Sequence, residues 1–277
     1  MGFGYNGKRT KNIFDPSSGE TFTLSRSKID LYFDCPRCFY LDRRLGVDRP
    51  PPFPFSLNNA VDELLKKEFD IHRAKQTKHP MMEAYGVEAV PFSHEKVEAW
   101  RDSLRRGVAF LHEPTNFLIR GGIDDVWVDP SGKLIVVDYK ATSKRGEVGI
   151  DAPWQSAYKR QMEIYQWLFR MNGFDVSDTG YFVYVNGKTD TEAFDGKLEF
   201  DISLIPYTGS TEWMEQTLFD MRKMLESNEI PDPSPECDYC KYREAAGRAF
   251  REHVQRYGTN KQQNSPQEGL DSQQKLV

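Results

Sequence analysis

One stretch near the middle of the chain, Gly121 to Lys140, has the pattern of a β-hairpin that carries acids and one lysine. In its second arm the side chains alternate, so that Asp138 and Lys140 share one face of the strand while Tyr139 lies on the other. An acid and a lysine at the end of an apolar strand face are costly to bury unless they are paired. A divalent cation would bind the carboxylate, and the lysine could then act on bound water or on a phosphate. The pattern therefore favours a metal-dependent phosphodiesterase, although an isolated D-x-K is more often a surface Asp–Lys pair.

The turn of this hairpin determines which acid faces Asp138. Pro130-Ser131-Gly132 suits a three-residue loop in which the glycine adopts the left-handed conformation. That loop places Asp124 directly opposite Asp138, with the β-carbons about 4.5–5.5 Å apart. Two carboxylates this close repel each other unless a cation lies between them. A four-residue loop would shift the register by one residue and select Asp125 instead. We expect Asp124 and keep Asp125 as the alternative.

Several short motifs follow one another along the chain in an order and spacing that chance seldom produces. They are Thr23-Leu24-Ser25-Arg26-Ser27, Tyr32-Phe33-Asp34-Cys35-Pro36-Arg37, Gly122-Ile123-Asp124, Asp138-Tyr139-Lys140, Gln161 with Tyr165, and Cys237-Asp238-Tyr239-Cys240. Together they span most of the chain and resemble the PD-(D/E)XK nuclease superfamily. The closest resemblance is to its RecB-like branch, which includes the CRISPR-associated exonucleases.

This resemblance implies a restriction-endonuclease-like α/β core with a mixed central sheet flanked by helices. It implies hydrolysis of DNA phosphodiester bonds with Mg²⁺ or Mn²⁺, in an exonuclease-like role in repair, recombination or defence. A helicase or another repair or defence protein is the partner to expect besides DNA. Asp124 and Asp138 would hold the metal, and the Tyr139 carbonyl would add a ligand. Lys140 would stabilise charge at the phosphate or position the attacking water.

The segment from Trp154 to Met171 is expected to be a strongly amphipathic helix. Its inward stripe contains Trp154, Tyr158, Gln161, Tyr165 and Leu168. Helical periodicity would make position 161 apolar, and a buried amide there needs partners. A neighbouring backbone carbonyl would serve as such a partner. The resemblance implies instead that Gln161 faces the metal site and that Tyr165 lies near the substrate backbone.

Asp62 lies beside the apolar stripe of another predicted helix, over residues 56–72. The related enzymes usually carry a histidine at this point as an additional metal ligand. An aspartate still supplies an oxygen ligand, and it favours hard cations such as Mg²⁺ or Mn²⁺. The alternative is a solvent-facing acid next to Glu63.

All four cysteines occur in CxxC pairs, Cys35 with Cys38 and Cys237 with Cys240. Four thiolates are the ligand set of a closed Zn²⁺ site or of an iron–sulfur cluster, and the long separation requires the N- and C-terminal segments to meet. The related enzymes bind a [4Fe–4S] cluster through one N-terminal and three C-terminal cysteines. The resemblance therefore implies a metal clip, a metal site that joins the two ends of the chain, with two cysteines from each end because one ligand is N-terminal here instead of C-terminal. The alternatives are buried thiols without a metal and a redox pair, which lacks the βαβ context it needs.

The composition sets limits on function. Charged residues make up 29% of the chain, the formal net charge is −5, and the mean hydropathy is −0.67. No apolar run approaches the ~18 residues of a membrane span, and the N-terminus lacks the apolar stretch of a secretory signal. We therefore expect a cytoplasmic protein without a membrane partner. The negative charge argues against a protein that coats nucleic acid through bulk charge, but not against a nuclease with a local acidic site.

Periodicity and turn residues give the expected organisation. We predict helices over residues 25–33, 38–44, 56–72, 95–111, 154–171 and 211–225, and strands over 181–185 and 198–204 besides the hairpin. Residues 1–22 are expected to be irregular, residues 23–250 to form the nuclease domain with its four-cysteine clip, and residues 257–277 to be a disordered polar tail. A second hypothesis is a non-catalytic nucleic-acid-binding module with a structural zinc or iron–sulfur site. The presence of Asp124, Asp138 and Lys140 together argues against it.

Overall fold

The computed structural model describes residues 8–51 and 56–258. The chain divides into two compact units, Met1–Asp232 and Pro233–Val277. Among the described residues, the first unit contains both sheets and all the helices except α8 (Asp238–Tyr257). The second contains α8, which begins directly after Cys237. No helix in the described ranges is long and apolar enough to cross a lipid bilayer.

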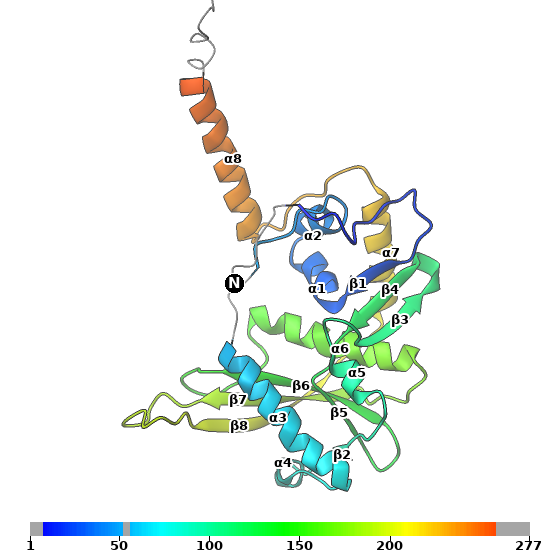
Figure 1. Ribbon diagram of the computed structural model, residues 1–277, viewed down its shortest axis with the longest axis vertical. Helices are drawn as coiled ribbons and strands as arrows, with labels where there is room; N and C mark the ends of the chain where they lie inside the picture. Colours follow the sequence, from blue (N-terminus) through cyan, green and yellow to red (C-terminus); the bar gives the residue numbers. More distant parts are fainter. Residues whose placement is uncertain (1–7, 52–55, 259–277) are drawn as a thin grey trace, which may run out of the picture. The chain divides into compact units, whose positions relative to one another are not determined.

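The larger of the two sheets in the first unit is mixed and has five strands (Figure 1). Its strands are, in spatial order, β2 (Val90–Pro91), β5 (Asp125–Val128), β6 (Leu134–Thr142), β7 (Thr179–Gly187) and β8 (Phe200–Thr208). Strands β6 and β7 are parallel, and the other neighbours are antiparallel. A parallel pair needs a crossover connection, and α6 (Ser156–Met171) supplies it.

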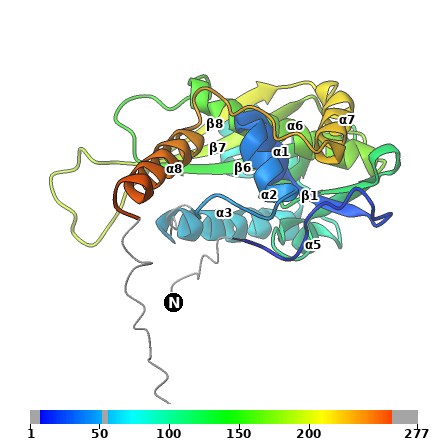
Figure 2. The same cartoon turned by 90° about the horizontal axis from the view of Figure 1, so that it is seen from above.

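Strand β6 is central, and its first six residues are all buried. Helix α3 (Ser56–Lys75) lies on one side of the strands and α6 on the other (Figure 2). Ile135, Val137 and Tyr139 pack in one apolar cluster with Leu65 and Phe69 of α3. The residues that alternate with them, Leu134 and Val136, pack in a second cluster with Met162, Tyr165 and Leu168 of α6. The expected mixed sheet flanked by helices is therefore confirmed.

A second, three-stranded sheet contains β1 (Phe22–Ser25), β4 (Phe117–Gly121) and β3 (Val108–His112), in that spatial order. Strand β1 is parallel to β4, and β3 is antiparallel to it. Three residues, Gly122 to Asp124, lead from β4 into β5 and so connect the two sheets. The site residues at the end of β4 and the start of β5 thus lie where the sheets meet.

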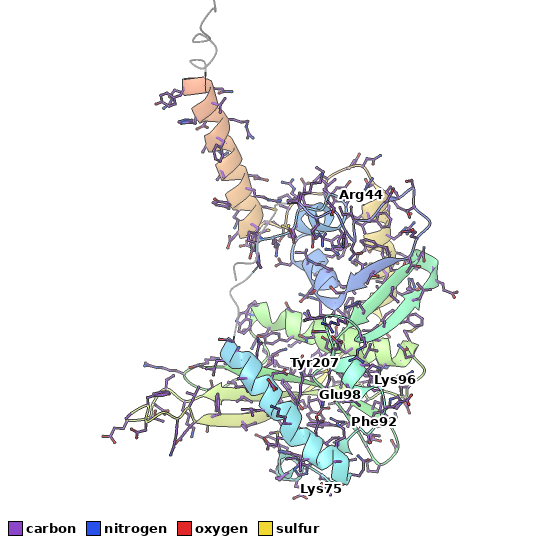
Figure 3. All side chains as sticks on the ribbon, in the orientation of Figure 1. Arg44, Lys75, Phe92, Lys96, Glu98 and Tyr207 are labelled. Carbon is purple, nitrogen blue, oxygen red and sulfur yellow. The ribbon has the colours of Figure 1, made fainter. Side chains whose placement is uncertain are left out.

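The remaining elements of the first unit are shorter. They are α1 (Arg26–Asp34), α2 (Pro36–Arg43), α4 (Pro80–Ala84), α5 (Val97–Arg101), α7 (Trp213–Glu226), and the 3₁₀ turns η1 (Glu113–Thr115) and η2 (Pro153–Gln155). Side chains fill the space between these helices and the sheets, with Phe92, Lys96 and Glu98 lying around α5 (Figure 3). Within the described part of the N-terminal segment, residues 8–21 form no helix or strand.

The helix predicted over residues 95–111 is wrong. Only Val97–Arg101 is helical, and residues 108–112 form β3. The reason is Gly107, which has a φ of +80° and lies so close to β4 that a β-carbon would be 2.6 Å from the carbonyl oxygen of Gly121. The chain therefore reverses at this glycine and pairs with β4.

Two further expectations differ from the structure. Trp154 was predicted to face inward, but it belongs to η2 rather than to α6, and 63% of it is exposed. Helix α8 was not predicted, and its apolar side chains such as Phe250 are exposed. The polar tail was expected from residue 257 onward, and residues 259–277 lie outside the described residues.

Candidate active site

The hairpin of β5 and β6 has the predicted register. Asp125 is opposite Val137, and Val128 is opposite Leu134. The turn is closed by a hydrogen bond of 3.0 Å from the amide of Asp129 to the carbonyl of Lys133, and Gly132 has a φ of +91°. The three-residue loop is thereby confirmed. Asp124 directly precedes the first pair of the ladder, and this register continued by one residue would put it opposite Asp138. The amide of Tyr139 donates to Asp124 Oδ2 at 2.9 Å.

Asp138, Lys140 and Gln161 form a closed cluster. Asp138 is fully buried, and its Oδ1 accepts a hydrogen bond of 2.6 Å from Gln161 Nε2. Lys140 Nζ forms an ion pair with Asp138 Oδ2 and donates to Gln161 Oε1 at 3.3 Å. The side-chain amide of Gln161 is therefore hydrogen-bonded to the side chains of Asp138 and Lys140 and not to a backbone carbonyl. Its Nε2 also donates to the hydroxyl of Tyr165 at 3.3 Å.

Burial raises the pKa of Asp138 to about 7, because the favourable charge of Lys140 does not offset the loss of water and the nearby charge of Asp124. Burial alone would lower the pKa of Lys140, but Asp138 and Asp124 raise it above its ordinary value. Burial is thus the main reason that Asp138 is more easily protonated than an exposed aspartate. Without a further cation, Asp138 takes up a proton near neutral pH. A site of this kind favours the binding of a cation by oxygen ligands.

A cavity of about 300 Å³ opens beside this cluster and is lined by Asp124, Gln161 and Tyr165. Asp62 also lines it, which brings this α3 residue into the site. Lys66 Nζ lies 2.7 Å from Asp62 Oδ2 and 3.8 Å from Asp124 Oδ1, and so bridges the two acids. Burial and the charge of Asp124 raise the pKa of Asp62. The basic side chains that line the cavity are Arg26, Lys66, Arg101 and Arg120.

Asp125 lies on the opposite face of the hairpin from the cavity. It is completely buried, and its Oδ2 accepts a hydrogen bond of 2.9 Å from the hydroxyl of Tyr139. Its Oδ1 accepts from Arg73 and, at 3.2 Å, from Arg101. The period-two alternation of the strand therefore separates the neighbouring acids: Asp124 faces the cavity, and Asp125 faces a buried ionic network.

Sequence reasoning did not identify Arg73 or Arg101. Both arginines also pair with Asp70 of α3, and Arg101 Nε donates to the backbone carbonyl of Asp124 at 3.1 Å. Arg101 therefore connects the buried network to the residue that faces the cavity. No local pattern could have identified them, because their partners on β5 lie more than twenty residues away in the sequence.

Glycines shape the wall of the cavity. A β-carbon on Gly121 would lie 2.5 Å from Cε1 of Tyr165, and one on Gly122 would lie 2.4 Å from Cβ of Ser103. Only glycine at these positions lets α6 and the segment after α5 approach the strand so closely. The tyrosine predicted to lie near the substrate is thus held against the end of β4.

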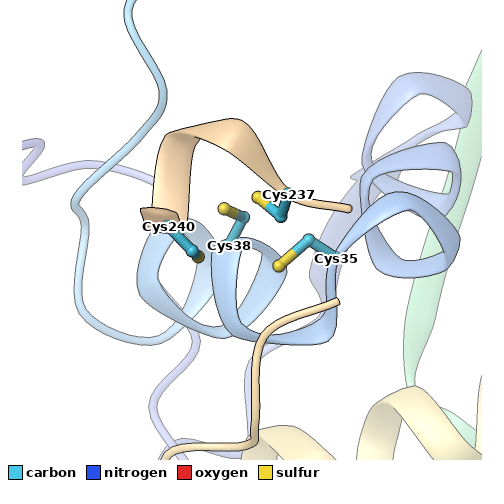
Figure 4. Close-up of side chains that lie close together, drawn as sticks. All are labelled: Cys35, Cys38, Cys237 and Cys240. Atoms are coloured by element: carbon cyan, nitrogen blue, oxygen red, sulfur yellow. The ribbon is translucent and has the colours of Figure 1, made fainter. Parts of the chain in front are cut away.

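The four cysteines are also brought together (Figure 4). The sulfur atoms of Cys35, Cys38, Cys237 and Cys240 all lie within 4.8 Å of one another, and all four residues are buried. Four thiolates at this separation are able to bind a metal ion. The expected four-cysteine arrangement is therefore present.

A family model described as the PD-(D/E)XK nuclease superfamily matches residues 23–245, which is most of the chain. No curated protein matches it.

Proposed function

Because the chain belongs to the PD-(D/E)XK nuclease superfamily, we propose that it is a metal-dependent DNA nuclease of the RecB-like branch. It would hydrolyse phosphodiester bonds in an exonuclease-like manner, in DNA repair, recombination or defence, with a helicase or similar protein as partner. One observation carries the catalytic part of this proposal. The buried cluster of Asp138, Lys140 and Gln161 lies beside a cavity that is also lined by Asp124 and has more basic than acidic side chains.

The donor set fits a hard divalent cation. Asp124 and Asp138 would hold Mg²⁺ or Mn²⁺, with Asp62 and the Tyr139 carbonyl as further oxygen ligands. The raised pKa of Asp138 supports this assignment, because a cation would replace the proton that the buried carboxylate otherwise takes up. When bound, such an ion polarises a phosphoryl oxygen and lowers the pKa of a coordinated water.

The protein's own side chains would bind and orient the DNA. The basic residues of the cavity attract the phosphate backbone, and Tyr165 would contact it at the wall formed by Gly121. Lys140 is held by Asp138 and Gln161, so its ammonium group is fixed before substrate arrives. A fixed positive charge at the scissile phosphate stabilises the charge that develops during hydrolysis.

The test is digestion of labelled single- and double-stranded DNA by the purified full-length protein. We expect cleavage with Mg²⁺ or Mn²⁺ and none with EDTA. Asp138→Asn keeps the shape of the side chain but removes its charge, and it should lower cleavage by about two orders of magnitude or more. Cleavage that survives EDTA or is unchanged in Asp138→Asn would count against the proposal.

The second candidate is a non-catalytic nucleic-acid-binding module with a structural metal at the cysteines. The observation in its favour is that the acids already form ion pairs within the protein: Asp62 pairs with Lys66, and Asp138 pairs with Lys140. This candidate predicts that the protein binds DNA, does not bind Mg²⁺ in calorimetry and never cleaves.

We further propose that the four cysteines hold a [4Fe–4S] cluster, with Zn²⁺ as the alternative. Replacing any one of Cys35, Cys38, Cys237 or Cys240 by serine should release the metal and lower the melting temperature, because metal binding contributes directly to folding. Lys241→Ala changes an exposed neighbour and should keep the metal. Elemental analysis of anaerobically purified protein identifies the ion: iron with sulfide indicates a cluster, and zinc without colour indicates a structural site. Protein that is folded and metal-free would contradict both versions.

A further inference from the structure

A groove of about 510 Å³ lies between α1 and the start of α6. Ser27 lines both this groove and the active-site cavity, so the two are adjacent. Gln161 of the catalytic cluster directly follows Arg160, which lines the groove. A polymer whose phosphate occupies the cavity can therefore continue into the groove.

Flat aromatic surfaces are exposed in this groove. Trp154 is 63% exposed and Phe33 is 41% exposed. The guanidinium group of Arg160 lies 5.1 Å from the centroid of the Phe33 ring. Two hydrogen-bond-length contacts to Asp30, both of 2.8 Å, hold that guanidinium in place. Aromatic rings and arginine planes are the surfaces on which unpaired nucleobases stack.

The charges of the groove differ from those of the cavity. Each of its arginines is matched by an acid: Arg160 pairs with Asp30, and Arg49 pairs with Asp34. The cavity is lined by four basic side chains and two acids, and among the basic ones Lys66 pairs with Asp62 and Arg101 with Asp70. The groove therefore offers stacking surfaces without excess charge.

We propose that this groove binds the unpaired bases of a single-stranded nucleic acid whose adjacent phosphate lies in the active-site cavity. The proposal rests on the proposed function and adds a base-binding subsite to it. In a duplex the base faces are covered by their neighbours, so stacking on Trp154 requires unpaired nucleotides. The groove, at about 510 Å³, is within the range of roughly 300–1,000 Å³ that is typical of sites for small molecules, and so has room for a ligand of nucleotide size.

Tyr158 connects the groove to the catalytic lysine. Its ring contacts Trp154 edge-on, with 5.5 Å between the ring centroids. Lys140 Nζ lies 4.5 Å from the centroid of the same Tyr158 ring. Two aromatic rings, those of Trp154 and Tyr158, therefore connect a base stacked on Trp154 to Lys140.

The test compares Trp154→Ala with the parent on two probes. One is a single-stranded DNA oligonucleotide. The other is an oligonucleotide of the same length in which every residue is abasic, so that the sugar–phosphate backbone is kept and the bases are missing. Affinity is measured by fluorescence anisotropy in EDTA, and kcat/KM is measured with Mg²⁺. We expect Trp154→Ala to weaken binding of the normal strand by about tenfold, the loss typical of one stacking contact. The abasic strand should bind the parent and the variant equally, and duplex binding should change less than twofold.

Two variants serve as controls. Phe194→Ala removes an aromatic side chain that is 71% exposed and does not line the groove, and it should bind like the parent. Trp154→Phe keeps an aromatic face and should restore most of the affinity. An equal loss on normal and abasic strands, or no loss on either, would overturn the subsite. Absence of any DNA binding would do the same. Tight, Trp154-dependent binding without cleavage would support the subsite while contradicting the proposed nuclease activity.

Discussion

Lys140→Ala is expected to lower the rate of DNA cleavage by about 10²- to 10³-fold, the loss typical of removing one charge-stabilising group. DNA affinity should stay within about twofold of the parent, because the basic residues of the cavity remain. The reason lies in how Lys140 is held. Its ammonium group is fixed between Asp138, Gln161 and the ring of Tyr158, so it needs no rearrangement to act at the phosphate.

Single-turnover cleavage and anisotropy separate the two effects, and a thermal melt reports the folding of the variant. Lys133→Ala is the matched control, since Lys133 belongs to the same hairpin but is exposed at its turn. The control should cleave like the parent. If Lys140→Ala cleaved as fast as the parent, Lys140 would have no catalytic role.

The parts of the site that could be predicted from the sequence depend on local rules. The loop Pro130-Ser131-Gly132 sets the hairpin register, and the alternation of β6 then determines which side chains share a face. Asp124, Asp138 and Lys140 follow from these two facts alone. Gln161 could be identified because one polar residue interrupted an apolar helical stripe. Its partners could be named only through the family resemblance.

The remaining features depend on contacts between distant segments. Residues 108–112 form β3 instead of a helix because Gly107 packs closely against Gly121. The two glycines are fourteen positions apart, so local sequence patterns around one do not include the other. The pairing of Arg73 and Arg101 with Asp125 likewise depends on how α3 and α5 pack on the sheet. Trp154 had suitable helical spacing, but the turn η2 directs it outward. Long-range packing thus overrode local periodicity at each of these positions.

The two neighbouring acids of the hairpin give the second large effect, and the structure changes what is expected of them. From the sequence alone, Asp125→Asn should leave most activity. The structure shows Asp125 completely buried and bonded to Arg73, Arg101 and Tyr139. Removing one partner of a buried ionic network costs about 3–5 kcal/mol. We therefore expect Asp125→Asn to lower the free energy of unfolding by about 3 kcal/mol, because Asp70 continues to pair with both arginines.

Asp124→Asn should have the opposite profile. Its side chain faces the cavity, and an asparagine oxygen can still accept the hydrogen bond from the amide of Tyr139. The fold should therefore be kept, with a free energy of unfolding within about 1 kcal/mol of the parent. The loss of one negative charge should weaken Mg²⁺ binding and stop turnover, since the remaining carboxylates attract the cation less strongly.

Urea unfolding, Mg²⁺ calorimetry and cleavage below the melting transition distinguish these two profiles. Asp125→Asn should be less stable, yet its folded fraction should bind Mg²⁺ and cleave DNA, because Asp124, Asp138 and Lys140 remain in place. Asp124→Asn should be stable and inactive. Such a result would separate two adjacent aspartates into one that supports the fold and one that serves the chemistry, as the alternation of a β-strand requires. If Asp125→Asn were stable and inactive while Asp124→Asn cleaved normally, Asp124 would not be the metal ligand, and the assignment of the cavity face as the catalytic face would be wrong.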